Sequence, residues 1–282
     1  MKVFKTVREL KISLKKISSV KSSIGFVPTM GALHKGHLSL IEESKKNNDI
    51  TIASIFINPT QFDKKGDLEN YPRTLENDLI LLKNIACDIV FTPSISELYN
   101  KSIVANSFDF DGLENNMEGS HRKGHFNGVG TIVKKLFEIV MPTNAYFGEK
   151  DFQQLQIIRK MVEKNHFPVT VVGCPTLREE NGLAMSSRNK LLTKEEKQQA
   201  SIIYEILNDV VKKTKSQSIE EIKEWVSNQF KNHPLFDLQY FIIAEEKTLK
   251  SVSIISQNKP QRAFIAVTIK NIRLIDNISI KH

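Results

Sequence analysis

Apolar runs alternate with helical patterns along the first part of the chain. Runs of strand type lie at residues 24–27, 50–57, 88–93, 145–148 and 169–172. Apolar residues recur at helical spacing at 6–20, from 38 onward, and at 75–85, 129–141 and 151–165. Near-continuous β-branched runs such as 50–57 are typical of strands buried on both faces of a parallel sheet. At least five alternations therefore predict an α/β fold with a doubly wound parallel sheet, whose ligands gather at the carboxyl ends of its strands.

The pattern changes beyond Pro175. The dipeptide Asn181-Gly182 is a strong hairpin signal. Two long amphipathic helical patterns follow at 193–214 and 218–232, and Thr193 with Glu196 forms a capping box for the first. The tail alternates like strands at 238–244, 263–269 and 272–275. We therefore expect two domains, with a smaller α+β domain at 176–282 after a first domain at 1–175.

Residues 100–127 lack a regular pattern within the first domain. Their second half, Glu118-Gly119-Ser120-His121-Arg122-Lys123-Gly124-His125-Phe126, is rich in cationic and turn-forming residues. Long loops in compact domains are often functional. We therefore expect this segment to take part in function.

Composition narrows the class of protein. The 282 residues are 40% hydrophobic, enough for a substantial core, and no run of about 18 apolar residues predicts a membrane span. The amino terminus has no apolar region of secretory type, so we expect a cytoplasmic location. Cys87 and Cys174 stand apart in apolar surroundings and are interpreted as buried free thiols rather than a disulfide or a metal site.

The formal net charge of +8 suggests anionic ligands. Lysine pairs are nevertheless scattered over predicted helices and loops, where most of them belong to solvated faces. A nucleic-acid groove combines clustered basic residues with aromatic residues, and that pattern is absent from the sequence. The charge therefore favours small anionic ligands over nucleic acid.

The segment from Ile24 to Ile41 predicts a strand, a tight loop at Thr29-Met30-Gly31 and the start of a helix. The amino-terminal end of a helix presents free N–H groups and a partial positive charge, so it suits phosphate. His34 and His37 stand three apart at this junction, with Gly36 between them. They fit three interpretations: surface histidines, a zinc pair, or phosphate ligands. Zinc is disfavoured because the usual helical pair is spaced four apart with a glutamate beside it.

Polar clusters follow three of the predicted strands, at 28–30, 58–61 and 148–151. Connections need polar residues in any case, so their chemical type is more informative than their presence. Gln61, Gln153 and Gln154 carry amides that recognise hydroxyls and carboxylates, and Lys150 opens a helix as a phosphate-binding cation would. These clusters favour the phosphate interpretation of the two histidines.

Two motifs together resemble the signatures of the nucleotidyltransferase superfamily. His34-Lys35-Gly36-His37 is similar to its HxGH box, and Met185-Ser186-Ser187-Arg188 to its KMSKS-like loop. Nearly the whole chain resembles the pantothenate synthetase (pantoate–β-alanine ligase) family, with a Rossmann-like first domain and a carboxy-terminal lid domain. The resemblance rests on the segments VPTMGALHKGHLSL, NPTQF, YPRTL, GHFNGV, GEKDFQQL and MSSRN.

The resemblance implies joining of pantoate to β-alanine through a pantoyl adenylate, with release of pyrophosphate and AMP. It assigns ATP contacts to Met30, Gly31, Ala32, Leu33, His34, Lys35, Gly36, His37, Gly148, Glu149, Lys150, Asp151, Leu177, Met185, Ser186, Ser187 and Arg188. It assigns pantoate binding to Gln61, Gln154 and Met30, and β-alanine binding to Gln61. Glu118 and Arg122 match a loop that closes over the site. The resemblance also implies a homodimer formed through the first domain.

Two departures from the family pattern stand out. Lys123 occupies a position where the family usually has proline, which puts the stiffness of the loop around Arg122 in question. Leu177 replaces a residue that is often valine. The second change is a mild one, because both side chains offer an apolar contact.

The chemistry of adenylation independently supports the implied roles. A carboxylate is a poor acyl donor until its oxygen is made a leaving group, and the first transition state gathers negative charge on phosphate oxygens. Lys150, Arg188, His34 and His37 supply cations and N–H donors, and Mg²⁺ on the β- and γ-phosphates supplies more charge. We interpret His37 mainly as an electrostatic stabiliser and proton donor, with a general-base role as the alternative. The sequence identifies no protein ligand of the Mg²⁺.

Two other functions are compatible with parts of the sequence. Another adenylyl or cytidylyl transferase on the same scaffold needs the phosphate residues but no pair of pantoate-binding glutamines. An RNA-binding or regulatory module is suggested by the basic carboxy-terminal half. We favour the synthetase, with pantoate, β-alanine and ATP as partners and neither nucleic acid nor membrane.

Overall fold

The computed structural model describes residues 1–18, 22–63, 65–99 and 102–281. Positions 19–20 of the first predicted helix and 100–101 of the irregular segment lie outside the described residues. The chain forms two compact units. The first consists of Met1–Glu149 and Gln153–Pro175, and the second of Lys150–Phe152 and Thr176–His282.

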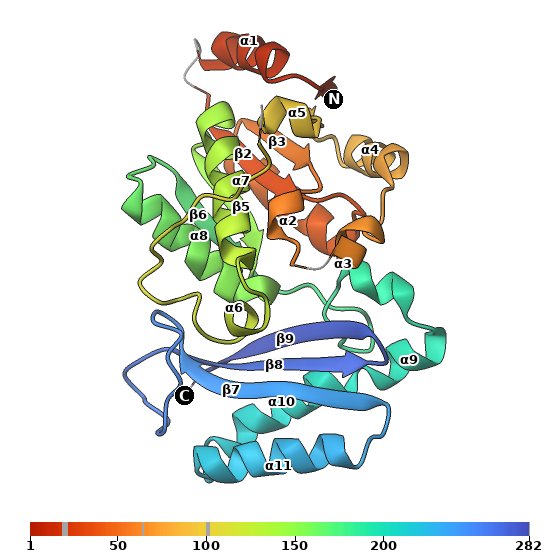
Figure 1. Cartoon of the computed structure of the whole chain (residues 1–282), viewed down its shortest axis with the longest axis vertical. Helices are drawn as coiled ribbons and strands as arrows, with labels where there is room; N and C mark the ends of the chain where they lie inside the picture. Colours follow the sequence, from red (N-terminus) through yellow and green to blue (C-terminus); the bar gives the residue numbers. More distant parts are fainter. Residues whose placement is uncertain (19–21, 64, 100–101, 282) are drawn as a thin grey trace. The chain divides into compact units, whose positions relative to one another are not determined.

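A six-stranded sheet forms the centre of the first unit as far as it is described, with strand order β1-β4-β3-β2-β5-β6 (Figure 1). All neighbouring strands are parallel, which confirms the predicted doubly wound fold. The strands are β1 (Lys2–Phe4), β2 (Ile24–Thr29), β3 (Ile50–Ile55), β4 (Ile89–Phe91), β5 (Asn144–Gly148) and β6 (Thr170–Cys174). The sequence pattern missed β1, a three-residue strand at the edge of the sheet.

Helices cover both faces of this sheet. Phe26 of β2 packs edge-on against Phe137 of α7, with ring centroids 6.3 Å apart, whereas the next residue, Val27, belongs to an apolar cluster with α2 and α4. The helices and 3-10 turns are α1 (Val7–Ser18), α2 (Lys35–Asn47), η1 (Pro59–Gln61), α3 (Lys65–Glu69), α4 (Leu75–Asn84), α5 (Ile95–Leu98), α6 (Glu118–His121), α7 (His125–Val140), η2 (Glu149–Asp151) and α8 (Phe152–Lys164). Covering both faces explains the near-continuous apolar character of the strands.

The sheet order places a topological switch point between β2 and β5. From β2 the chain continues to β3 and β4 on one side, and β5 and β6 lie on the other. Ligands of open α/β sheets bind outside the carboxyl ends of strands at such a point. The loops that follow β2, β3 and β5 are therefore the place to look for a site.

Several predicted boundaries differ in the structure, and two of them lie close to the candidate site. β2 does not end before Pro28 but continues to Thr29. Thr29 O accepts a hydrogen bond from Phe56 N on the β3 side. Successive residues of a strand direct their main-chain groups to opposite neighbours, so the nitrogen of Pro28 faces the β5 side. The pairing of β5 with β2 ends at Phe26, before this position. Its missing N–H therefore costs no ladder bond. Helix α7 begins at His125, not Val129, after a left-handed Gly124.

The second unit contains a three-stranded antiparallel sheet with order β7-β8-β9. Its elements are η3 (Ser187–Leu191), α9 (Lys194–Gln199), α10 (Ile202–Lys213), α11 (Ile219–Lys231), β7 (Phe236–Glu245), β8 (Gln261–Ile269) and β9 (Ile272–Ile280). The capping box of Thr193 with Glu196 is confirmed. The single helix predicted at 193–214 is instead divided at Ala200 and Ser201, where the Ser201 hydroxyl donates to Gln198 O.

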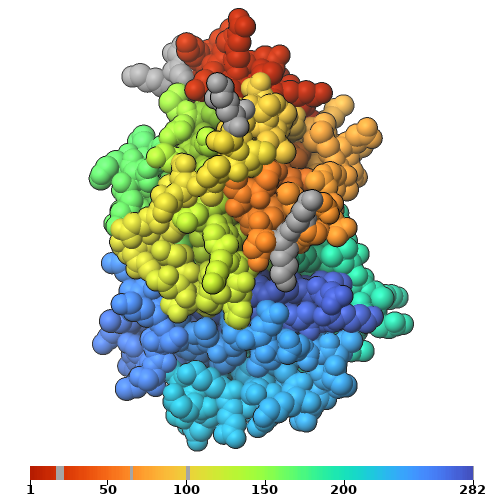
Figure 2. Space-filling view, in the orientation of Figure 1, coloured from red at the N-terminus to blue at the C-terminus, as the bar shows by residue number. Residues whose placement is uncertain are grey.

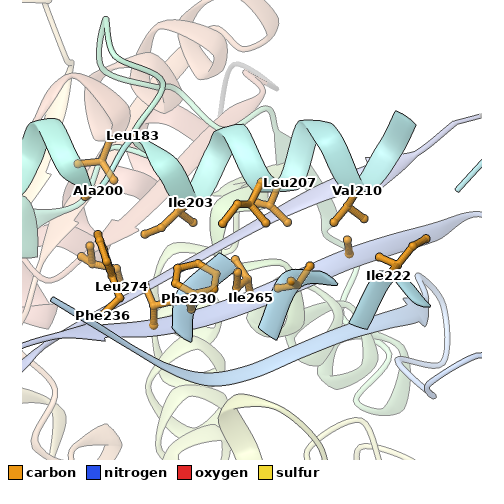
Figure 3. Close-up of a cluster of buried hydrophobic side chains, with 14 of the residues drawn as sticks. Leu183, Ala200, Ile203, Leu207, Val210, Ile222, Phe230, Phe236, Ile265 and Leu274 are labelled. Atoms are coloured by element: carbon orange, nitrogen blue, oxygen red, sulfur yellow. The ribbon is translucent and has the colours of Figure 1, made fainter. Parts of the chain in front are cut away.

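The core of the second unit joins these helices to the sheet. Ile203, Leu207 and Val210 of α10 lie along one side of that helix and are almost fully buried (Figure 3). They cluster with Phe230 of α11 and Ile265 of β8. This arrangement is the α+β organisation expected from the tail of the sequence.

Both cysteines are free and buried, as predicted. Burial raises the pKa of Cys87 and that of Cys174 to about 11, so both thiols stay protonated near neutral pH. Among the described residues, no helix combines the length and apolar character that crossing a membrane requires.

Candidate active site

The junction of β2 and α2 forms a tight turn that ends in a capped helix. Gly31 and Ala32 both adopt left-handed backbone conformations, with φ of +81° and +51°. His34 is the N-cap of α2, and its Nδ1 accepts a hydrogen bond of 3.1 Å from Gly36 N. The first turn of α2 therefore has the strand, loop and helix geometry that suits an anion.

The two histidines lie beside each other on this first turn. The ring centroids of His34 and His37 are 4.1 Å apart and the planes are tilted by 38°. Because Nδ1 of His34 accepts a hydrogen bond, the neutral ring carries its proton on Nε2. Within the described part of the chain, no group of three His, Cys, Asp or Glu residues is placed to hold a metal ion. The geometry favours the phosphate interpretation.

A buried carboxylate holds this turn from outside the segment. Asp78 of α4 accepts hydrogen bonds from Ala32 N at 2.9 Å and from Leu33 N at 2.8 Å. Asp78 could not be recognised from the sequence, because an acidic residue in the first turn of a helix is common.

Gln61 and Met30, both predicted to bind pantoate, meet at the carboxyl ends of β3 and β2. Gln61 lies in η1 and is 8% exposed. Its Nε2 donates to Met30 Sδ at 2.9 Å, and its Oε1 accepts from Asn58 Nδ2 at 3.2 Å. The amide is therefore fixed in one orientation, next to the turn that leads to the two histidines.

Asn58 organises the segment that carries Gln61. It is 1% exposed, and its Nδ2 also donates to Gly128 O of α7 at 3.1 Å. Its Oδ1 accepts from the hydroxyl of Tyr99 at 2.6 Å. Burial raises the pKa of Tyr99, which keeps this donor protonated. The sequence placed Asn58 in a polar cluster but gave no sign that it supports Gln61.

Arg122, predicted to belong to a closing loop, lies against the backbone of Gln61. Its guanidinium donates to His125 Nε2 at 3.2 Å and to Gln61 O at 3.4 Å, and it lies 3.8 Å from the carboxylate of Asp63. Since His125 Nε2 accepts from the guanidinium, its Nδ1 carries the proton and donates to Gln61 O at 2.8 Å. The loop and the predicted substrate amide are thus joined through one carbonyl.

The neighbouring glutamines of α8 have different surroundings. Gln153 is 4% exposed and bonds the loop itself, accepting from Glu118 N and donating to Leu113 O and Asn116 O. The expectation that Gln153 recognises substrate was therefore wrong, because both N–H groups of its amide are donated to the loop, whereas among the described residues the amide of Gln61 donates a single bond, to Met30. Gln154 is only partly buried. The loop segment 102–117 runs over the surface of the first unit, where it is yellow in Figure 2.

In the second unit, the predicted ATP-binding residues lie in a hairpin and in the turn that follows it. Met185 N donates to Leu177 O at 3.0 Å, and Arg178 and Ala184 form a bridge between the two arms. This confirms the hairpin predicted from Asn181-Gly182. Ser186 then caps η3 by accepting from Arg188 N at 3.3 Å. Leu177 and the Met185–Arg188 segment are therefore brought together.

Strand β9 anchors the remaining cations. Arg188 donates to Arg273 O at 3.3 Å, and Asn277 Nδ2 donates to Lys150 O at 2.9 Å. Lys150 and Asp151 thus belong to the second unit, whereas Gly148 and Glu149 belong to the first. The residues predicted to contact ATP are distributed over both units.

Comparison with known proteins supports one family. The family model for pantoate-β-alanine ligase matches residues 2–279. The pantothenate synthetases of Flavobacterium psychrophilum and Christiangramia forsetii are each 52% identical to this chain, with alignments that cover 100% of both proteins. The match therefore extends over the full length of the curated relatives.

Solved structures give the same result for the fold. The crystal structure of pantothenate synthetase from Thermus thermophilus has a TM-score of 0.93 and 38% identity, and covers 100% of both chains. Pantoate-β-alanine ligase from Francisella tularensis, solved with β-γ ATP and β-alanine, has a TM-score of 0.82 and 35% identity. That alignment covers 99% of this chain and 97% of the other.

Proposed function

The chain belongs to the pantoate–β-alanine ligase family and is an enzyme that joins pantoate to β-alanine with consumption of ATP; we propose that it does so through a pantoyl adenylate formed at the amino-terminal end of α2. One observation carries the proposal: Gln61 is hydrogen-bonded to Met30, directly before the turn that leads to His34 and His37. A bound acid and an anion at the helix start would thereby be neighbours. The homologue bound to ATP and β-alanine supports the same substrates here.

In the first step, a carboxylate oxygen of pantoate attacks the α-phosphorus of ATP and pyrophosphate leaves. Negative charge develops on the phosphate oxygens, and preorganised donors in a site without water stabilise it best. His34 Nε2–H and the His37 ring supply such donors from the first unit, at the positively polarised amino-terminal end of α2. Lys150 and Arg188 supply cations from the second unit.

ATP enters this step as its magnesium complex. Mg²⁺ is held through substrate phosphates, water and one or two carboxylates more often than by a dedicated protein cage. We assign ATP to Met30–His37, Gly148–Asp151 and Met185–Arg188, with the adenine against the backbone near Leu177.

In the second step, the neutral amine of β-alanine attacks the carbonyl carbon of the adenylate and AMP leaves. Water must be kept away, because it would hydrolyse the intermediate. We assign pantoate to Gln61, Gln154 and Met30, and β-alanine to Gln61. Closure over the site is assigned to the Glu118–Arg122 segment. His37 acts as electrostatic stabiliser and proton donor. The second unit is proposed to act as a lid, and the enzyme to be a cytoplasmic homodimer assembled through the first unit.

Exchange of labelled pyrophosphate into ATP tests the proposal directly. We expect exchange that requires pantoate and Mg²⁺ and does not require β-alanine. Exchange without any acid, or with other acids equally well, would point to a different nucleotidyltransferase. Salt-sensitive RNA binding without exchange would instead support a binding module.

A further inference from the structure

Asp78 is a fully buried carboxylate close to a proposed phosphate site. It has 0% exposure and lies in the first turn of α4. A buried charge is costly unless it is paired or hydrogen-bonded. Its two oxygens accept from Ala32 N and Leu33 N, and the Thr74 hydroxyl lies 3.2 Å from both. Every described contact of the carboxylate is therefore a hydrogen bond to a neutral donor.

The turn that Asp78 bonds is one that the local sequence does not favour. Ala32 has a Cβ and a φ of +51°, a left-handed conformation that costs a residue other than glycine about 1–2 kcal/mol. Two successive N–H groups bonded to one carboxylate compensate for that cost. His34, the N-cap of α2, lies two residues after Ala32. The direction in which α2 begins therefore depends on the bonds to Asp78.

The charge of Asp78 works against the ligand that this turn is proposed to bind. A carboxylate near phosphate groups repels them, and the repulsion is stronger in a protein interior than in water. Its contribution to ATP binding must therefore come from the geometry that it imposes.

We propose that Asp78 is a positioning residue for the ATP-binding turn, which it holds by bonding Ala32 N and Leu33 N. The inference rests on the proposed function of that turn. It predicts that removal of the negative charge, which by itself would favour an anion, weakens the use of ATP.

The test compares Asp78→Asn with Leu79→Ala. Asparagine has the same size but offers one acceptor oxygen, and its NH₂ group faces an N–H donor. Leu79 is the next residue of α4 and is half-buried in the apolar cluster, so Leu79→Ala destabilises the same helix but leaves the carboxylate of Asp78 and its two main-chain bonds in place. We expect kcat/KM for ATP to fall about 10- to 100-fold in Asp78→Asn, the scale of a misplaced reacting group, and to stay near wild type in Leu79→Ala. KM for pantoate should change less than KM for ATP.

Amide hydrogen exchange gives a second measurement that does not depend on activity. The peptide containing Ala32 and Leu33 should exchange faster in Asp78→Asn than in wild type, with no such change in Leu79→Ala. Thr74→Val, which removes only the hydroxyl that supports Asp78, should show a weaker effect in the same direction and serves if Asp78→Asn does not fold.

Three outcomes would overturn the inference. One is equal kcat/KM for ATP in Asp78→Asn and Leu79→Ala at equal stability. Another is full rescue of Asp78→Asn by added Mg²⁺, which would make the carboxylate a metal ligand. The third is unchanged exchange at Ala32 and Leu33. If the wild type showed no pantoate-dependent pyrophosphate exchange, the proposed function would be overturned instead. Amide hydrogen exchange at Ala32 and Leu33 would then still test whether Asp78 holds the turn.

Discussion

The two segments proposed to bind the phosphates of ATP are held in different ways. In the first unit, the Gly31–His34 turn is fixed through its own main chain, which bonds the buried carboxylate of Asp78. In the second unit, the Met185–Arg188 segment depends on side chains that reach β9. Arg188 bonds Arg273 O, and the adjoining hairpin is tied to β9 by a bidentate ion pair of Arg178 with Asp276, at 2.6 and 3.0 Å.

The difference separates two kinds of sensitivity. Main-chain bonds to a buried acceptor leave the first segment little room to move, so we expect substitutions there to act on the use of ATP and on the catalytic step. Side-chain anchors in the second unit are partly open to solvent, because the side chain of Arg178 is 17% exposed. We expect substitutions there to act on the stability of the unit and on ATP binding.

The largest effect should come from His37→Ala, which removes one preorganised donor from the first segment. We expect adenylate formation to fall by about 10²-fold or more. Pyrophosphate exchange measures the loss, and thermal unfolding should remain close to wild type because the ring is only half-buried. Exchange at a near-normal rate would remove His37 from the catalytic step.

Asp276→Asn tests the second segment. Loss of the charge that pairs with Arg178 leaves a guanidinium without its carboxylate, and we expect about 3 kcal/mol of lost stability. Trp225 of α11, the single tryptophan of the chain, reports unfolding of this unit by fluorescence in urea. Asp209→Asn is the matched control, since its pair with Lys212 is exposed and contributes less than about 1 kcal/mol. Equal midpoints for the two variants would show that the hairpin does not depend on β9.

Gln154→Leu sharpens the assignment of the acid substrate. A buried polar group of pantoate left without a partner costs about 1–3 kcal/mol, so KM for pantoate should rise while KM for ATP changes little. Gln153→Leu should behave differently. It loses its bonds to Leu113, Asn116 and Glu118 and should expose that loop to proteolysis. Equal weakening of both substrates by Gln154→Leu would indicate a general defect.

The smallest expected effect is on the pH dependence of stability, through Cys87. This thiol follows α4 in the first unit and is 1% exposed. Burial raises its pKa to about 11 from an ordinary value of 9.0. Between these two values the thiol ionises in the unfolded chain but stays protonated in the folded one. The unfolded chain then binds fewer protons, so the free energy of unfolding falls as pH rises through this window. Urea unfolding followed by far-UV circular dichroism should show a smaller fall in Cys87→Ala, and parallel curves would contradict the assignment.

Local patterns allowed much of the backbone structure around the candidate site to be predicted. The strand, turn and capped helix at Ile24–Ile41 follow from an apolar run, a glycine and a change of period. Asp78 could not be found in that way, because its partners lie 46 and 45 residues earlier in the chain. Gln153 and Gln154 have the same chemistry, and only the direction of each side chain on α8 decides which one bonds the loop. At Ser201 a single hydroxyl interrupts a helical pattern that the apolar spacing would continue.

The pairing of β2 with β5 has a consequence for how the molecule folds. Ile24 N bonds Thr143 Oγ1 across 119 residues, whereas β8 and β9 meet through a tight turn at Ile269 and Ile272. Closing a long loop costs more chain entropy and slows folding, so the antiparallel meander should form sooner than the central parallel pair. During synthesis, β2 gains its second neighbour only after residue 144 has left the ribosome. A nascent chain therefore contains the complete HKGH motif long before it contains β5, the strand that completes the pairing of β2.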